Sequence, residues 1–146
     1  MTTVGAIMAQ NHDIPGKINI DVIGIGSGVY DRLEELGVPD ITAVNVAEKP
    51  MDTERFGNLR AEIFWNLREK FINDEIYIPN DPVLMAELSA IEYKFTSRGQ
   101  IMLESKDELK KRTGRSPDRA DALALSYTGV SSAKSFSLGK HSLFRR

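Results

Sequence analysis

Two aspartates stand at positions where a chain usually carries an apolar residue. Asp21 follows the apolar residues that begin at Ile18, and Asp121 lies within the apolar run 120–125. A carboxylate in such a setting costs several kcal/mol of desolvation unless a positive charge pairs with it. A divalent metal ion is the obvious partner for two converging carboxylates, whose mutual repulsion should otherwise lower the stability of the fold. The two runs therefore predict a metal site that contains Asp21 and Asp121.

A third acidic residue, Asp118, lies three positions before Asp121, so one helix face can present both side chains. Ser116 is a suitable helix cap, and Pro117 suits the first helical position. Asp118 would then lie in the first helical turn, where the helix dipole alone favours an acid. A metal-binding carboxylate and a purely structural one both stay open at this position.

The segment around Asp21 has the order strand, tight turn, helix and strand. We expect strands over residues 17–23 and 41–46, with a helix between them that ends at Gly37. This order predicts two adjacent parallel strands joined by a right-handed crossover. Ligands of open α/β sheets lie at the carboxyl ends of strands, and Asp21 falls at such an end.

A glycine-rich run, residues 24–28, follows Asp21 directly. Such runs can cradle a phosphate at a helix N-terminus, which would make the chain a small nucleotide-binding α/β protein. The dinucleotide pattern G-x-G-x-x-G is not met, because no glycine follows Gly28 at the required spacing. A steric role, in which glycines let the backbone turn sharply beside Asp21, is the favoured interpretation.

Periodicity in the rest of the chain predicts further helices and one hairpin. Apolar residues spaced three and four apart follow the cap Asn58 and predict a long helix with a buried stripe. The other expected elements are a short helix over 2–10, a strand-like stretch over 75–78, a helix over 82–90, hairpin strands over 91–96 and 101–104, a basic helix over 106–112 and a last helix from Ser116 towards Gly129. We expect one α/β domain over 1–129, with its core in 17–129, and a disordered basic tail over 130–146.

The composition narrows the kinds of site and partner. The 146 residues include no cysteine, which leaves oxygen or histidine ligands and favours magnesium or manganese over structural zinc. No apolar run reaches the roughly 20 residues of a membrane span, and no signal peptide is recognisable. The net charge of −2 hides an asymmetry: residues 1–93 carry 16 acidic and 7 basic side chains, and residues 94–146 carry 5 and 12. A basic half favours a polyanion such as DNA.

Within this basic half, five residues just before the last predicted helix are candidates for phosphate contacts near the metal site: Lys106, Lys110, Lys111, Arg112 and Arg115. Contacts of this kind hold the DNA backbone without reading its sequence. An ordinary solvated helix face explains the same residues equally well.

Together, two runs resemble the nuclease domain of tailed-phage large terminase subunits. They are residues 18–33, Ile-Asn-Ile-Asp-Val-Ile-Gly-Ile-Gly-Ser-Gly-Val-Tyr-Asp-Arg-Leu, and residues 115–125, Arg-Ser-Pro-Asp-Arg-Ala-Asp-Ala-Leu-Ala-Leu. The resemblance implies a ribonuclease H-like fold, a mixed sheet flanked by helices. It also implies cleavage of double-stranded DNA with two magnesium or manganese ions, with Asp21 and Asp121 as metal ligands and Asp118 at an assisting position. The segment 58–62 also resembles a family segment, and we assign it a core role only.

The start of the chain departs from this family. The family contributes a further metal-binding aspartate from the first strand of an opening hairpin, and the residues before 17 offer no counterpart. Asp13 does not replace it, because its surroundings are not strand-like. We therefore expect an N-terminally truncated form of the fold. A catalytically impaired terminase remnant that serves as a DNA-binding or assembly module is the alternative function.

The resemblance also implies partners and a location. The partners are double-stranded DNA and, in a full packaging complex, an ATPase motor domain, a small terminase and a portal. The sequence has no Walker-type G-x-x-x-x-G-K-[ST] motif of its own, so such a motor would lie outside it. The location is the cytoplasm of a bacterial host, as a phage or prophage product.

Overall fold

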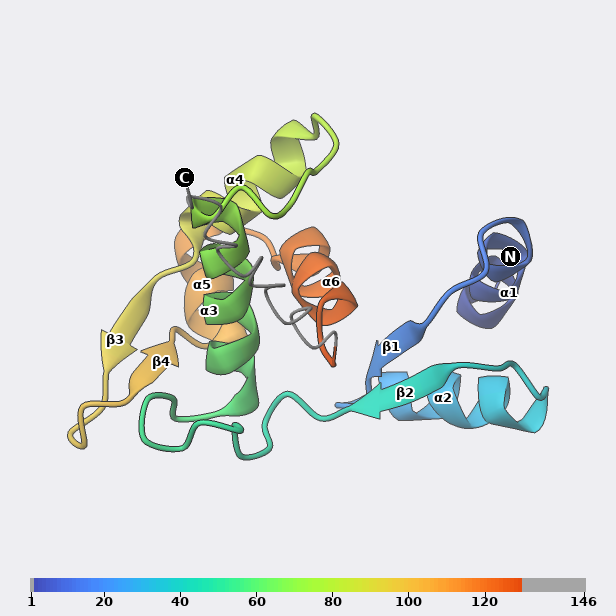
Figure 1. Cartoon of the computed structure of the whole chain (residues 1–146), viewed down its shortest axis with the longest axis horizontal. Helices are drawn as coiled ribbons and strands as arrows, with labels where there is room; N and C mark the ends of the chain where they lie inside the picture. Colours follow the sequence, from blue (N-terminus) through green and yellow to red (C-terminus); the bar gives the residue numbers. More distant parts are fainter. Residues whose placement is uncertain (1, 130–146) are drawn as a thin grey trace, which may run out of the picture.

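The computed structural model describes residues 2–129 of the chain. Figure 1 shows the elements formed by residues 3–44 at one end of the molecule and those formed by residues 59–126 at the other. The elements in order are α1 (Thr3–Asp13), β1 (Ile18–Asp21), α2 (Gly26–Glu35), β2 (Ile41–Val44), α3 (Leu59–Ile72), α4 (Pro82–Ala90), β3 (Tyr93–Phe95), β4 (Ile101–Leu103), α5 (Lys106–Thr113) and α6 (Asp118–Ser126). The predicted tail over 130–146 lies outside the described residues.

Strands β1 and β2 are adjacent and parallel, as the sequence predicts. Ile18 pairs with Ile41 and Asp21 with Val44, and α2 forms the connection between the strands. Strands β3 and β4 form the predicted antiparallel hairpin, with Tyr93 opposite Leu103. Within residues 2–129 these two pairs are separate two-stranded sheets. The α/β fold class is confirmed, and Asp21 ends the strand that carries it.

The glycine-rich turn after Asp21 has a steric cause. Gly24 has a φ of +70°, a left-handed conformation that side chains rarely adopt. A Cβ added to Gly26 would lie 1.8 Å from the backbone oxygen of Asp21, which no real side chain tolerates. The helix α2 therefore begins at Gly26, earlier than the run 24–28 suggests, and the close approach supports the steric interpretation.

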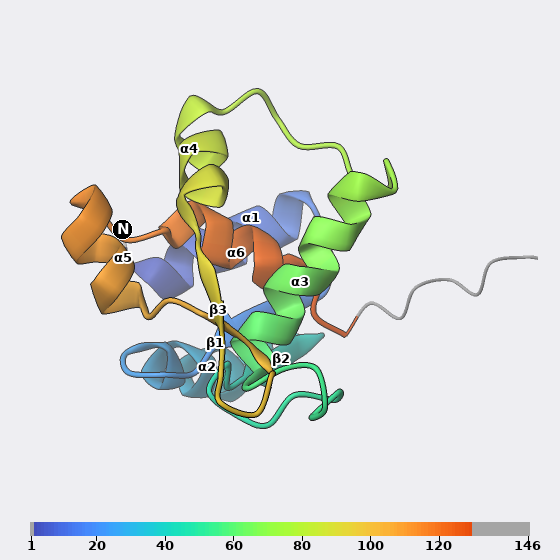
Figure 2. The same cartoon turned by 90° about the vertical axis from the view of Figure 1, so that its left-hand side faces the viewer.

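Helix α3 forms the centre of the fold. Asn58 caps it by accepting a hydrogen bond of 2.9 Å from the backbone N–H of Ala61, as expected. Its apolar stripe packs against β2 and α6, and the resulting core contains Val44, Val46, Ile63, Leu67, Ile76 and Ala124. Figure 2 shows α3 and α6 side by side. The helix also buries Arg60 and Glu62, two charges that the stripe does not predict.

Two local expectations prove wrong. Residues 75–78 are irregular and form no strand. Ser116 does not cap α6, because the helix begins at Asp118 and its capping residue is Pro117, which offers no side-chain hydrogen bond. Glu87 of α4 replaces it: its Oε2 accepts hydrogen bonds from the backbone N–H of Arg119 at 2.8 Å and of Ala120 at 2.9 Å. Among residues 2–129, none of the helices combines the length and apolar character of a membrane span.

Candidate metal centre

Asp21 and Asp121, 100 positions apart in the sequence, converge on one ammonium group. The Nζ of Lys106 lies 3.5 Å from Oδ2 of Asp21 and 3.0 Å from Oδ2 of Asp121. The two oxygens therefore cannot be farther apart than the sum of these two distances. Their side chains are 21% and 15% exposed. The structure thus brings together the two aspartates that the apolar runs single out.

The second oxygen of each carboxylate has its own partner. Oδ1 of Asp21 accepts a hydrogen bond of 3.1 Å from the backbone N–H of Ile23, in the turn after β1. Oδ1 of Asp121 accepts one of 3.3 Å from Nη2 of Arg60. Each carboxylate is thereby fixed through Oδ1, while both Oδ2 atoms face the same cation.

Arg60 is a member of this cluster that the sequence interpretation missed. It is only 8% exposed, and its Nη1 also donates to the backbone oxygen of Glu104 at 3.0 Å. Its guanidinium lies 5.1 Å from the ring centroid of Phe64, within the range of a cation–π contact. The only sequence signal is an arginine in the first turn of a helix with an apolar stripe, which a surface arginine would match equally well.

The charges of the two aspartates are balanced by basic side chains of the chain itself. Lys106 and Arg60 supply two positive charges beside the two negative ones. A buried or half-buried carboxylate requires such partners. Attraction to these two cations opposes the repulsion between the carboxylates, and the predicted cost of the metal-free site stays a prediction.

The donor set fits a divalent cation. Asp21, Arg60, Lys106 and Asp121 line a small cavity of about 10 Å³, together with apolar residues that include Phe64. Residues 2–129 contain no cluster of three or more histidine, aspartate or glutamate side chains that would complete a cage. Magnesium often binds proteins through only one or two carboxylates and completes its shell with water and substrate phosphates. The Oδ2 atoms of Asp21 and Asp121, which both face the ammonium of Lys106, match this mode of binding.

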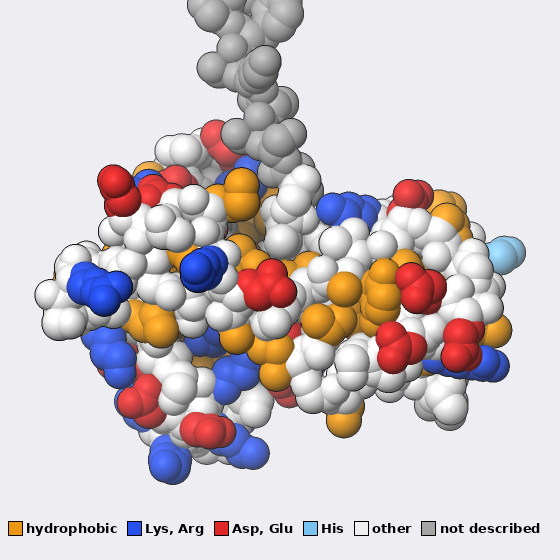
Figure 3. Space-filling view, turned by 90° about the horizontal axis from the view of Figure 1, so that it is seen from below, with side chains coloured by type: hydrophobic (Ala, Val, Ile, Leu, Met, Phe, Trp, Pro, Cys, Tyr) orange, Lys and Arg blue, Asp and Glu red, His pale blue; other side chains and the backbone are white. Residues whose placement is uncertain are grey.

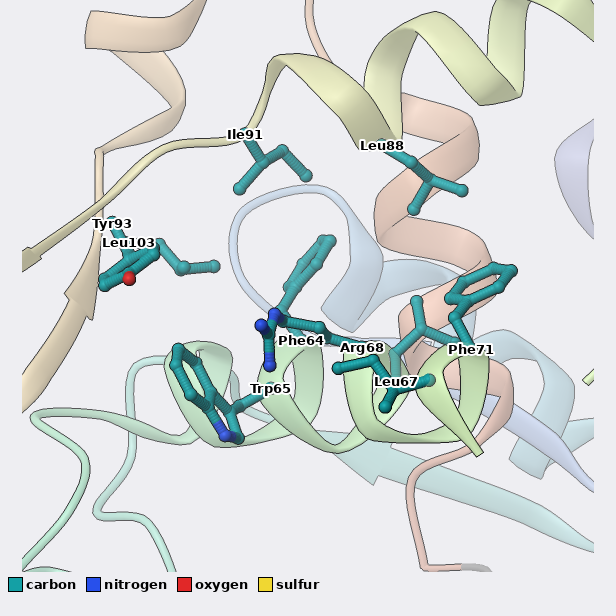
Figure 4. A pocket seen from close by; sticks show the side chains of 10 residues that line it. Phe64, Trp65, Leu67, Arg68, Phe71, Leu88, Ile91, Tyr93 and Leu103 are labelled. Carbon is teal, nitrogen blue, oxygen red and sulfur yellow. The ribbon is translucent and has the colours of Figure 1, made fainter. Parts of the chain in front are cut away.

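An apolar hollow of about 340 Å³ lies next to this cavity, and Phe64 lines both. Figure 4 shows Trp65, Leu67 and Phe71 of α3 lining it, with Tyr93 and Leu103 of the hairpin opposite. Arg68 is the one charged residue in its lining. A hollow lined in this way offers no carboxylate for a metal ion, whereas the cavity on the other side of Phe64 is lined by Asp21 and Asp121.

Asp118 lies away from the pair. It is exposed in the first turn of α6 and does not line the cavity that Asp21 and Asp121 share. Its position agrees with the structural interpretation, an acid at the positive end of a helix. The assisting role that the resemblance implies remains a prediction.

The five basic candidates divide into two groups. Lys106 contacts both aspartates, and Arg112 is bound by Glu104, Glu92 and the backbone oxygen of Ala90, so neither is a free cation. Lys110, Lys111 and Arg115 are exposed at the end of α5 and just after it. Figure 3 shows acidic and basic side chains interspersed over the face seen from below. The charge asymmetry of the sequence therefore does not produce a surface of one sign on this face.

The ion pair of Arg112 with Glu104 makes acid stability testable. Burial raises the pKa of Glu104, but hydrogen bonds from Arg112 and the backbone N–H of Glu92, with the charge of Arg112, outweigh it and hold the pKa below 4.5. Because the pKa of Glu104 is lowered by folding, its carboxylate stabilises the fold at pH values above 4.5. This contribution is lost as the pH falls through the folded-state pKa. Arg112→Gln should therefore lower the melting temperature at pH 7 and have a smaller effect at about pH 3. An equal effect at both pH values would contradict this assignment.

Comparison with known proteins identifies the class of fold. No protein-family model matches the sequence, and no curated protein matches it. The solved structures that match include nuclease domains of phage large terminase subunits. The chain therefore has the fold of this class of nuclease domain, as the two aspartate runs predict.

Three of these structures give the extent of the likeness. The nuclease domain of the large terminase subunit gp2 of bacterial virus Sf6 is 23% identical, with a TM-score of 0.64, over 83% of this chain and 69% of that chain. Its K428A mutant with manganese and beta-thujaplicinol has a TM-score of 0.65 at 22% identity, with the same coverage. The large terminase nuclease of thermophilic phage G20c with bound magnesium is 20% identical, with a TM-score of 0.64, over 86% of this chain and 59% of that chain.

Proposed function

We propose that this chain is a metal-dependent endonuclease domain of a phage DNA-packaging terminase that cleaves double-stranded DNA. The observation that carries the proposal is the convergence of Asp21 and Asp121, through their Oδ2 atoms, on one cation position at the carboxyl end of β1. Structures of the same fold contain manganese, magnesium, calcium or cobalt. In this proposal the domain works beside an ATPase motor, a small terminase and a portal.

The chain's own residues prepare the site for phosphodiester hydrolysis. Asp21 and Asp121 would hold magnesium or manganese, and Asp118 is proposed to assist from one turn earlier on α6. Two such ions, when bound, supply an activated water and stabilise the leaving oxygen. Arg60 and the N–H of Ile23 hold the Oδ1 atoms, which limits the movement of both carboxylates. Fixed ligands of this kind reduce the reorganisation that the reaction would otherwise require.

The basic residues after Lys106 are proposed to bind the DNA backbone. Lys110 follows Lys106 by one helical turn, so the two lie on the same face of α5. Lys111 and Arg115 add further charge at the exposed end of the helix. Contacts of this type are insensitive to sequence and weaken as salt is added. Arg112 is left out of this set because Glu104 and Glu92 already bind it.

A second candidate function is a DNA-binding or assembly module that does not cut. The observation that favours it is the ion-pair network itself, because Lys106 and Arg60 neutralise both aspartates without any metal. In such a module the aspartates would serve stability alone. The basic end of α5 would then account for DNA binding in the same way.

Supercoiled plasmid separates the two functions. With the wild-type chain and Mn²⁺ or Mg²⁺, we expect conversion to nicked and linear DNA, and none when EDTA is present. The same samples in a gel-shift assay report DNA binding independently of cutting. Retention of DNA without cleavage in either metal would overturn the nuclease proposal and support the binding module.

A further inference from the structure

Asn19 forms a clamp between β1 and the C-terminal end of α6. Its Nδ2 donates hydrogen bonds to the backbone oxygen of Leu125 at 2.8 Å and to that of Thr128 at 3.0 Å. The first of these carbonyls lies in the last turn of α6 and also accepts a hydrogen bond of 2.9 Å from the backbone N–H of Thr128, and the second lies just after the helix. The Oδ1 of Asn19 is buried and has no partner within residues 2–129. The amide therefore acts here through its donor group, and its acceptor stays unused among these residues.

The contact between Asn19 and α6 and the contact between the two aspartates involve the same strand and the same helix. Asn19 and Asp21 lie two residues apart on β1, on the same face and about 6.8 Å apart along the strand. Leu125 and Asp121 lie four residues apart on α6, on the same face and about 6 Å apart along the helix. Asn19 lies against Leu125, and Asp21 lies against Asp121 through Lys106. The strand and the helix thus meet in two successive contacts of nearly equal spacing.

From this geometry we infer that Asn19 is a positioning residue that sets the register of α6 on β1. By fixing Leu125 opposite Asn19, it places Asp121 opposite Asp21 one step further along both elements. The inference deepens the proposed nuclease function and rests on it for its catalytic meaning. It assigns Asn19 no contact with substrate or metal.

The chemistry of the position explains why asparagine serves here. Two carbonyl oxygens need a group with two N–H donors and no negative charge, which an aspartate of the same shape would violate. A shift of one residue along β1 would turn the side chain to the other face of the sheet. Ile18 and Ile20 on that other face have no donor to offer. Position 19 is the place on this strand from which an amide can hold α6 while Asp21 faces Asp121.

The first test measures the metal affinity of folded protein. Mn²⁺ titrations, followed by the electron paramagnetic resonance of free Mn²⁺, compare wild type with Asn19→Leu, which keeps the branch at Cγ and removes the donors. We expect binding to weaken by about 10-fold, the lower end of the effect seen when groups bonded directly to metal ligands are removed, because Asn19 acts on Asp121 through α6. The matched control is Thr42→Val, because Thr42 pairs with Asn19 in the register of β1 and β2 and no hydrogen bond from it to α6 occurs among the described residues. The control should leave the affinity unchanged.

The second test needs no metal and uses the absence of cysteine from the sequence. The double substitution Asp21→Cys with Asp121→Cys is treated with dibromobimane, which becomes fluorescent when it joins two neighbouring thiols. Asn19→Leu should slow the cross-linking, whereas Thr42→Val should not. Asn19→Gln, which keeps the amide on a longer arm, should give an intermediate rate and serves as the test if Asn19→Leu does not fold.

The outcomes separate this inference from the proposed function. An unchanged Mn²⁺ affinity together with an unchanged cross-linking rate in Asn19→Leu would overturn the inference, whatever the loss of melting temperature. Absence of Mn²⁺ binding to the wild type, with cross-linking slowed by Asn19→Leu, would overturn the metal site and leave the register role established. A loss of affinity in both Asn19→Leu and Thr42→Val would assign the effect to general loosening of the sheet and would reject Asn19 as the specific determinant.

Discussion

Asp121→Asn should abolish the stabilisation that Mn²⁺ gives to the wild-type chain and should lower plasmid nicking by about 100-fold or more. An amide has nearly the shape of the carboxylate but lacks its charge, so the helix and its packing are retained while the cation loses a ligand. At a free Mn²⁺ concentration of about 100 times its Kd, the wild type should gain about 2.7 kcal/mol of unfolding free energy. Thermal unfolding with and without Mn²⁺ measures this gain in both proteins.

The controls for this prediction are two exposed acids, one on α5 and one on α6. Asp107→Asn changes an exposed acid beside Lys106 in α5 and should leave the metal response unchanged. Asp118→Asn should retain most of it, because Asp118 does not line the cavity of the pair. An undiminished Mn²⁺ response in Asp121→Asn would show that the ion binds elsewhere, and the two-aspartate centre would have to be withdrawn.

Glu87→Ala should lower the unfolding free energy by about 2–3 kcal/mol, because it leaves two N–H groups of α6 without their acceptor. Glu87 is 7% exposed, and its Oε2 accepts from Arg119 and Ala120. Glu87→Gln keeps a neutral acceptor and should cost less. Urea unfolding of each variant gives the values.

A surface acid provides the comparison. Glu35 is exposed, and within residues 2–129 its one ion pair is with Arg32, one helical turn away, so Glu35→Ala should change the unfolding free energy by less than about 0.5 kcal/mol. Equal losses in Glu87→Ala and Glu35→Ala would mean that Glu87 is not the cap of α6. Since α6 carries Asp121, Glu87→Ala should also weaken Mn²⁺ binding.

Local patterns in the sequence were sufficient to predict the strand that carries Asp21 and the parallel pairing of β1 with β2. The aspartates themselves could be found because each is an acid in an apolar run, and this anomaly is visible without any partner. The hairpin, α4 and the cap Asn58 follow from short-range signals in the same way.

The partners of those aspartates could not be found, because each contact joins distant parts of the chain. Arg60 lies 61 positions from Asp121, and Asn19 lies 106 positions from Leu125. No local pattern distinguishes such an arginine or asparagine from a surface residue. Ser116 was wrongly predicted as the cap for the same reason. The backbone N–H of Arg119 donates to Glu87, which lies 32 positions earlier in the sequence.

The neutralisation of Asp21 and Asp121 by Lys106 and Arg60 has a practical consequence for handling the protein. Small domains that are held together by a structural zinc ion unfold when a chelator removes it, because metal binding supplies much of their folding free energy. Here the carboxylates already have cations from the chain itself, and the core of α3, β2 and α6 forms around apolar residues. The domain should therefore remain folded through purification in EDTA, and the ion can then be added as a separate variable to a protein of known metal content.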